Sequence, residues 1–153
     1  MKALCSSVQR FGPLVARVLI ALPFVVAGLG KLAAFPKTAA FMANKDLPMP
    51  EVLLVAAIAL ELGGSVLLIL GWKARWVAAA LAGFTLVATL IFHAFWAVEP
   101  QLVREEINNF LKNLAILGAL LYVVAYGAGP LSVGRDDCPG SEPAPAPAPR
   151  KRR

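Results

Sequence analysis

The stretch from Glu51 to Leu70 constrains this chain most, because it is long and apolar enough to cross a membrane yet holds a carboxylate, Glu61, near its middle. A helix of that length rises about 30 Å, which matches the hydrocarbon core of a bilayer. An ionisable side chain at that depth costs about 2.5 to 3.5 kcal/mol, so it should face protein or a wet cavity. Ala57, Gly64 and Ser65 lie about one helical turn away, so another helix can approach this face closely. We therefore expect Glu61 to meet a partner on a neighbouring helix.

Three further apolar blocks have the length of a membrane span, at residues 13–33, 74–97 and 108–128. The composition fits a membrane protein, since 59% of the residues are hydrophobic and only 16% are charged. Arg17 inside the first block, Lys31 after it and the later spans argue against a cleaved signal peptide. The sequence therefore predicts an all-α membrane protein, an antiparallel bundle of four transmembrane helices within residues 13–132.

The segments outside the spans have compositions typical of interfaces and tails. Residues 34–50 place prolines around an amphipathic middle that suits a short helix at the membrane surface. Residues 71–76, GWKARW, combine tryptophans and cations as a tight interfacial turn should. Residues 98–107 are expected to form a polar loop, and residues 1–12 a short N-terminal segment. Residues 133–153 hold a Pro/Ala-rich tract with a basic end and are predicted to be a disordered tail.

The net charge of +6 is read as a signal of membrane orientation and not of nucleic-acid binding, because the basic residues flank apolar blocks and form no patch with aromatic residues. With four spans, the N-terminus, the 71–76 turn and the tail share one side. That side carries more cations than the other, so both termini are predicted to be cytoplasmic. Arg17 and Arg75 would then be basic anchors at the inner face. The cations of the inner side are Lys2, Arg10, Arg17, Lys73, Arg75, Arg135, Arg150, Lys151, Arg152 and Arg153, against Lys31, Lys37, Lys45, Arg104 and Lys112 on the outer side.

Each predicted span contributes a polar side chain to the outer half of the bilayer, and these are Lys31, Glu61, His93, and Lys112 with Asn113. One interpretation is a pocket that opens outward, in which Glu61 and His93 exchange protons or bind a quinone or another small polar ligand. Lys31 or Lys112 would then act as countercharges. The alternative is that these groups bond one another and hold the bundle in register, while the two lysines extend to the interface.

No pattern for a tightly held cofactor is visible in the sequence. Cys5 and Cys138 lie near opposite ends of the chain and outside any CxxC pair, and His93 is the single histidine, so no metal site is predicted. The chain also lacks a nucleotide or flavin motif and a pair of haem ligands. Electron transfer would therefore need a bound quinone or a partner subunit, and catalysis by this chain alone is not expected.

The ordered set of motifs resembles the DoxX family of small bacterial membrane proteins. The resemblance rests on Arg17 followed by FVVAGLGKL, on LELGGSVLLILGWKAR, on HAFW and on NFLKNLAILGALLYVVAYGAG, and it extends over all four spans. The chain departs from the family pattern after Gly129, where a serine-aspartate ending is usual and Pro130 follows instead. The resemblance implies a four-helix protein of the bacterial inner membrane. The family is named after a subunit of a thiosulfate:quinone oxidoreductase, and some members are linked to membrane oxidoreductase complexes and to thiol or oxidative-stress resistance.

From the residues and the resemblance together we expect an inner-membrane component of a quinone-linked or thiol and oxidative-stress redox system. Its expected partners are membrane lipids and either a redox subunit or further copies of itself. A non-catalytic assembly or scaffold subunit, whose polar groups only stabilise the bundle, is the alternative. A small-solute transporter is a weaker hypothesis, because the four spans show no inverted repeat.

Overall fold

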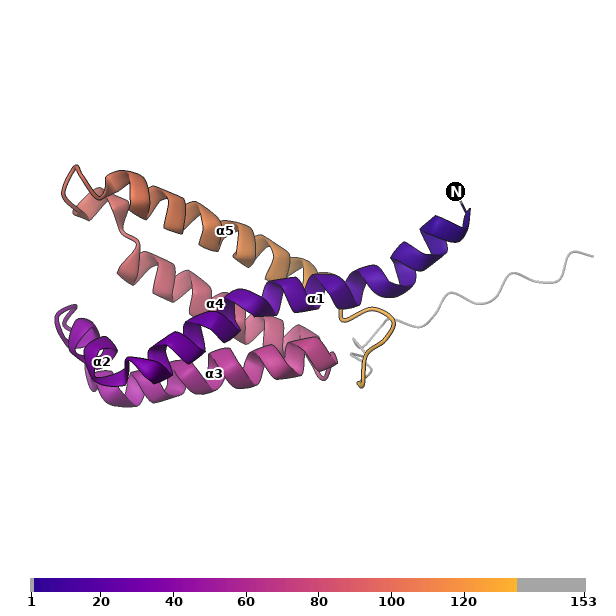
Figure 1. Cartoon of the computed structure of the whole chain (residues 1–153), viewed down its shortest axis with the longest axis horizontal. Coiled ribbons are helices and arrows are strands. Elements are labelled where there is room, and N and C mark those ends of the chain that lie inside the picture. Colours follow the sequence, from indigo (N-terminus) through magenta and orange to yellow (C-terminus); the bar gives the residue numbers. More distant parts are fainter. Residues whose placement is uncertain (1, 135–153) are drawn as a thin grey trace, which may run out of the picture.

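Four long helices dominate the structure, a computed structural model that describes residues 2–134 and their side chains from residue 5 onward. The predicted tail therefore lies almost entirely outside the described residues. The helices α1, α3, α4 and α5 are each long and apolar enough to cross a membrane, which confirms the predicted all-α fold with four spans. The elements, in chain order, are α1 (Lys2–Ala33), α2 (Phe35–Ala43), α3 (Pro50–Leu70), α4 (Ala74–Phe92), a 3-10 turn η1 (Phe95–Ala97) and α5 (Val103–Tyr126) (Figure 1).

The ends of the helices differ from the predicted spans: α1 and α5 begin before their apolar blocks, whereas α4 and α5 stop before the predicted ends. Helix α1 begins at Lys2 instead of residue 13, and it runs on through Pro13 and Pro23. Helix α5 begins at Val103 instead of residue 108, with acidic residues in its first turn that favour a helix start. The regular helix of α4 ends at Phe92, so His93 caps the helix and does not lie within it. The short helix expected in residues 34–50 is α2.

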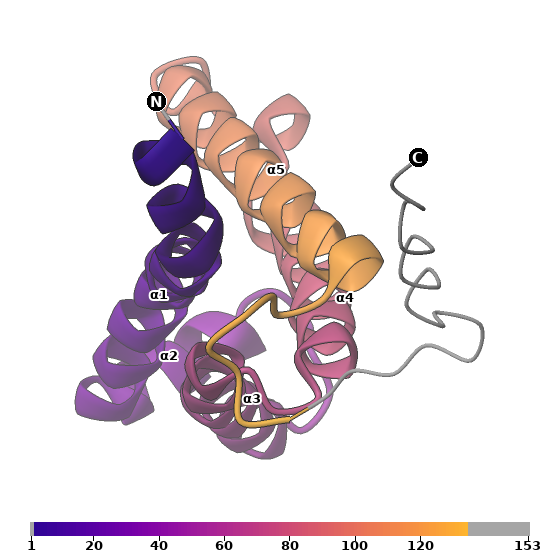
Figure 2. The same ribbon diagram turned by 90° about the vertical axis from the view of Figure 1, so that its right-hand side faces the viewer.

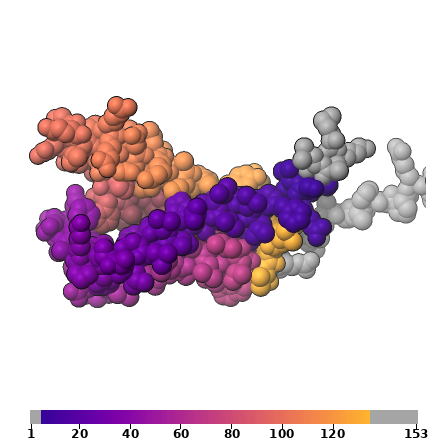
Figure 3. Space-filling model, in the orientation of Figure 1, coloured from indigo at the N-terminus to yellow at the C-terminus, as the bar shows by residue number. Residues whose placement is uncertain are grey.

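The four spans form two closely packed pairs, and contacts between α3 and α4 join one pair to the other. Helix α1 packs along α3, and α5 packs along α4, while α3 and α4 connect the pairs. Helices α1 and α5 share few contacts, and they diverge toward the end of the molecule that carries α2 (Figures 1 and 3). The bundle is therefore tight at one end and parted at the other.

The tight end contains the main hydrophobic core, with Leu68, Leu81 and Leu120 among its fully buried side chains. A smaller cluster lies at the parted end, where α2 covers the first turns of α3. The small face predicted around Glu61 is present: a Cβ at Gly64 would lie 3.2 Å from Leu81 Cδ2, so α3 and α4 approach closely there. Large apolar side chains such as Leu19, Val55 and Leu121 point outward, as expected for a lipid-facing surface.

Two arginines hold the tight end together by donating hydrogen bonds to carbonyls at the ends of α3 and α5 and in the segment after α5. Arg17 is only 1% exposed, and its guanidinium donates to Leu131 O at 2.7 Å and to Leu68 O at 3.4 Å. Arg75 donates to Val124 O at 3.3 Å and to Ala125 O at 3.1 Å. Cations at helix C-termini compensate the unpaired carbonyls and the dipole. These residues, predicted as inner-face anchors, therefore bond protein carbonyls, and Arg17 is buried in doing so.

A segment that we call the strap, residues 127–134, crosses the tight end from α5 toward α3 (Figure 2). Its Val133 N–H donates to Leu70 O at 2.9 Å, and Leu131 O accepts from Arg17. Gly129 has a φ of +74°, and a Cβ there would lie 2.7 Å from Pro13. The strap therefore ties the ends of α1, α3 and α5 to one another.

Candidate functional site

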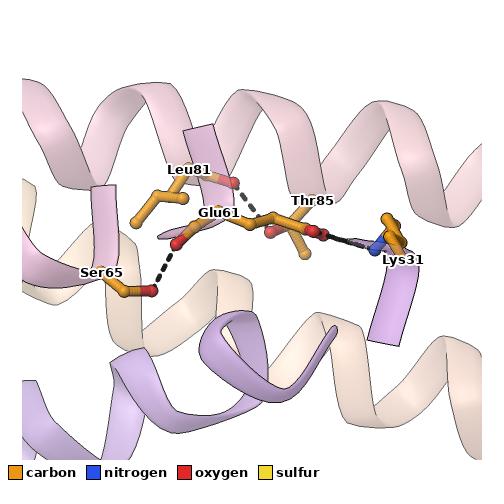
Figure 4. A network of polar contacts seen from close by, with 5 residues as sticks. All are labelled: Lys31, Glu61, Ser65, Leu81 and Thr85. Carbon is orange, nitrogen blue, oxygen red and sulfur yellow. Dashed lines mark hydrogen bonds and ion pairs between the residues drawn. The ribbon is translucent and has the colours of Figure 1, made fainter. Parts of the chain in front are cut away.

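Glu61 forms an ion pair with Lys31 across the contact between α3 and α1, so the expected partner on a neighbouring helix is confirmed. Lys31 Nζ lies 2.7 Å from Glu61 Oε1 and 3.0 Å from Oε2 (Figure 4). The Glu61 side chain is 4% exposed, whereas that of Lys31 is 29% exposed. The helices meet at Gly28, where a Cβ would lie 2.8 Å from Leu62 Cδ2. A small residue on α1 thus permits the close approach that joins the two charges.

Buried hydroxyl groups of α3 and α4 lie near the Lys31–Glu61 ion pair. Ser65 is fully buried, and its hydroxyl donates to Glu61 O at 2.5 Å and to Ala21 O at 3.3 Å. Thr85 and Thr89 donate to the carbonyls one turn earlier, Leu81 O at 2.7 Å and Thr85 O at 2.6 Å. Sequence reasoning missed both threonines, although their spacing of one helical turn within an apolar helix was a signal for a shared face.

A cavity of about 660 Å³ lies at the parted end of the bundle, between α1, α2, α3, α4 and α5. Its volume is typical of small-molecule sites, which span about 300–1,000 Å³. Most of its lining is apolar, with Phe24, Leu54 and Phe84 among the larger side chains. The structure brings all the predicted polar residues to this one cavity, and they are Lys31, Glu61, His93, Lys112 and Asn113.

His93 lines the cavity together with Glu61, and its hydrogen-bond partner is Glu106 near the start of α5. His93 Nδ1 lies 2.7 Å from Glu106 Oε2, and both side chains are partly exposed. Lys112 donates to Asn109 Oδ1 at 3.0 Å. Glu106 was missed because residues 98–107 were assigned to a loop, whereas its position in the first turn of α5 aims it back at the α4 end.

Aromatic rings pack around the same end of the bundle. Phe95 and Trp96 of η1 meet Phe110 of α5 edge to face, with centroid distances of 5.4 Å and 6.1 Å. Phe41 of α2 stacks on Phe92 of α4 at 5.7 Å, and both rings line the cavity. These contacts hold η1 and α2 beside the polar residues at the parted end of the bundle.

Comparisons with known proteins decide the family. The DoxX family model matches residues 12–94. Inner membrane protein YphA of Escherichia coli is 32% identical over 122 residues, which cover 80% of this chain and 87% of YphA. Inner membrane protein YqjF of the same organism is 35% identical over 129 residues, which cover 83% of this chain and 92% of YqjF. The chain belongs to the DoxX family.

A weaker similarity joins this DoxX protein to the Surfeit locus protein 4 homolog of Schizosaccharomyces pombe, with 35% identity over 69 residues, or 44% of this chain and 23% of that protein. No solved structure matches. The inner-membrane relatives and the four apolar helices together make the chain a multi-pass protein of the bacterial inner membrane. The family match includes Lys31 and Glu61, whereas Lys112 and Asn113 lie on α5, beyond the matched residues.

Proposed function

We propose that this DoxX protein is the membrane component of a quinone-linked or thiol and oxidative-stress redox system, and that its cavity binds a quinone. The observation that carries the proposal is the lining of the cavity, which combines apolar walls with a few polar side chains from different helices. A quinone has matching chemistry, because its ring and tail are apolar and its carbonyl oxygens accept hydrogen bonds. Lys31, Lys112 and Asn113 supply N–H donors on the wall of the cavity.

The charged pair suits this ligand, because reduction of a quinone takes up protons as well as electrons. Lys31 and Glu61 lie 2.7 Å apart on the cavity wall, where the pair can hold a proton close to a bound ring. The electrons would come from a partner redox subunit, because the sequence carries no motif for a redox group. We propose the cytoplasmic side for both termini, which places the cavity in the outer half of the bilayer.

Quinone binding by the full-length protein in nanodiscs tests the proposal. Decylubiquinone is titrated into wild type, Glu61→Gln and His93→Ala, and thermal unfolding checks that each variant is folded. Glu51→Gln is the matched control, because it removes a carboxylate from the exposed start of the same helix, outside the cavity lining. We expect saturable binding by wild type and the control, and weaker binding by the folded cavity variants. Absence of saturable binding by wild type would refute the proposal.

One observation favours a second candidate, an assembly or scaffold subunit that binds no ligand. Three of the cavity's polar side chains already have partners within the protein, since Lys31 bonds Glu61, His93 bonds Glu106 and Lys112 bonds Asn109. If their work is only to stabilise the bundle, Glu61→Gln lowers the unfolding temperature and the retention of a partner subunit, while no quinone binds to any variant. The titration and the unfolding measurement therefore separate the two candidates.

A further inference from the structure

One ammonium group on the lining of the cavity, that of Lys112, has no carboxylate partner among the described residues. Lys31 is neutralised by Glu61 at 2.7 Å, whereas the hydrogen bond of Lys112 goes to the neutral amide of Asn109. His93 is bonded to Glu106, which is not among the lining residues. Lys112 is exposed, and among residues 5–134 its ammonium forms no ion pair. A ligand with a negatively charged group could form the ion pair that Lys112 lacks within the described part of the protein.

The ammonium of Lys112 lies where the polar part of α5 meets its apolar part. Residues 103–113, VREEINNFLKN, carry nearly all the polar side chains of the helix, and residues 114–126 are apolar apart from two tyrosine hydroxyls. Lys112 and Asn113 stand at this boundary and face the cavity. In a membrane such a boundary marks the level of lipid head groups. A head group bound there would leave a chain to extend along Phe24, Leu60 and Phe84, which line the deeper part of the protein.

The arrangement of the helices provides a way in from the bilayer. Both α1 and α5 contribute lining residues, yet they share few contacts and diverge at the end that carries α2 (Figure 1). In the space-filling view the two helices are parted at this end, and atoms of α4 are visible between them (Figure 3). The opposite end is closed by the main core, by Arg17 and by the strap. The parted side would face lipid, so a molecule dissolved in the bilayer can reach the cavity sideways.

We propose that the cavity takes up a long-chain carboxylate, the anion of a fatty acid, from the bilayer through the gap between α1 and α5, with Lys112 and Asn113 binding its head group. The Lys112 ammonium, which forms no ion pair within the described residues, and the Asn113 amide donate hydrogen bonds to the carboxylate. This inference goes beyond quinone binding and does not need it. Because both ligands would fill the same apolar space, the carboxylate would compete with a quinone.

Binding of oleate and of oleyl alcohol, which differ in head group and share their chain, tests the head-group assignment. Wild type in nanodiscs is expected to bind oleate at least about tenfold more tightly than the alcohol, because hydrogen bonds to a charged group are stronger than those to a neutral hydroxyl. Lys112→Gln should abolish that preference and Lys112→Arg should restore it. Arg104→Gln is the matched control, since it removes an exposed cation from the same helix away from the cavity.

Equal binding of oleate and oleyl alcohol by wild type would overturn the head-group assignment, as would equal losses in Lys112→Gln and Arg104→Gln. Thermal unfolding of each variant excludes misfolding as the cause of a loss. Decylubiquinone is titrated in parallel, so the two proposals fail separately. Oleate binding without quinone binding removes only the quinone, and quinone binding without a preference for oleate removes only the carboxylate.

A cross-link between the two helices tests the route. Ala27 of α1 and Ile116 of α5 both line the cavity, and each is replaced by cysteine in a Cys5→Ser, Cys138→Ser background. A bis-maleimide that joins them is applied before or after loading with oleate. We expect loss of uptake when the link is made first and trapped oleate when it is made second. Unchanged uptake after linking would show that the ligand enters elsewhere.

Discussion

At the scale of residues, the two members of the central ion pair lie in different surroundings. The Glu61 side chain is 4% exposed, whereas the Lys31 side chain is 29% exposed and belongs to the last turn of α1. A long lysine side chain can extend toward the head groups when its partner is removed. The carboxylate of Glu61 has no such route, because it is enclosed at the middle of α3. Loss of one partner should therefore cost more when the lysine is the one removed.

Substitution of each partner in turn measures this difference. We expect Lys31→Met to lower the free energy of unfolding by about 3 kcal/mol, because it leaves a buried carboxylate without its countercharge. Glu61→Gln should lower it by about 1 kcal/mol, since the amide keeps a hydrogen bond and the lysine can move outward. Unfolding by SDS titration in mixed micelles gives both values. Equal losses, or a larger loss in Glu61→Gln, would contradict this account of the pair.

Arg17 should contribute more to the stability of the fold than its position as a basic anchor in the sequence indicates. It is 1% exposed and donates to carbonyls of α3 and of the strap. We expect Arg17→Met to lower the free energy of unfolding by about 3 kcal/mol, because the buried carbonyl of Leu68 and the carbonyl of Leu131 lose their charged donor. Arg17→Lys should recover little, since one ammonium cannot replace the guanidinium fork. Arg10→Met, at an exposed position of the same helix, is the control, and a comparable loss there would contradict the assignment.

At the scale of elements, a glycine at the C-terminal cap of α3 and a glycine within α3 lie in different surroundings. Gly71 caps the helix with a φ of +71°, and a Cβ there would collide with Arg17 Nη1. Gly63 lies within the helix, and a Cβ there would meet nothing within 4 Å. The same substitution at the two positions should therefore act in opposite directions.

We expect Gly71→Ala to lower the unfolding temperature, because the left-handed cap becomes strained and Arg17 is displaced from its carbonyls. Gly63→Ala should leave the temperature unchanged or raise it, since alanine stabilises a helix by up to about 1 kcal/mol relative to glycine. Circular dichroism in detergent during heating measures both. A loss in Gly63→Ala as large as that in Gly71→Ala would mean that the cap geometry is not the cause.

The helices themselves were predictable from sequence because bilayer thickness sets the length of an apolar span. The residues at which the helices begin and end were harder to predict. Hydropathy marks where a helix meets water and not where its backbone hydrogen bonds stop. The helical start of α1 at Lys2 and the start of α5 at Val103 show the difference. The partner of Glu61 was expected because a buried charge requires one. The pairing of His93 with Glu106 and the bonds of Arg17 depend on the tertiary packing of the helices, which a local sequence pattern does not predict.

At the scale of the whole molecule, the bundle is closed at one end and parted at the other. The strap and the arginines hold α1, α3 and α5 together at the closed end. The cavity and the charged pair lie toward the parted end. If both termini are cytoplasmic, the closed end faces the cytoplasm and the parted end faces the other side of the membrane. The orientation therefore decides which compartment the polar residues of the cavity can reach.

Cysteine labelling of intact cells measures the orientation. Lys45→Cys, in the exposed segment after α2, is expected to react with an impermeant maleimide from outside in a chain without other cysteines. Cys5, which is exposed near the start of α1, should react only after the membrane is permeabilised, when Cys138 is replaced by serine. The charge distribution of the sequence is the reason for this expectation. The reverse labelling pattern would place the cavity in the inner half of the bilayer.

Binding of decylubiquinone after the cavity is filled tests most directly whether this cavity is a quinone site. Ala88→Trp puts a large ring on the lining of α4, and Leu86→Trp puts the same ring at an exposed position of that helix outside the lining. In folded protein we expect saturable binding by wild type and by Leu86→Trp, with at least about a tenfold loss in Ala88→Trp, or about 1.4 kcal/mol. Binding that is absent from wild type, or unchanged in Ala88→Trp, would contradict the account.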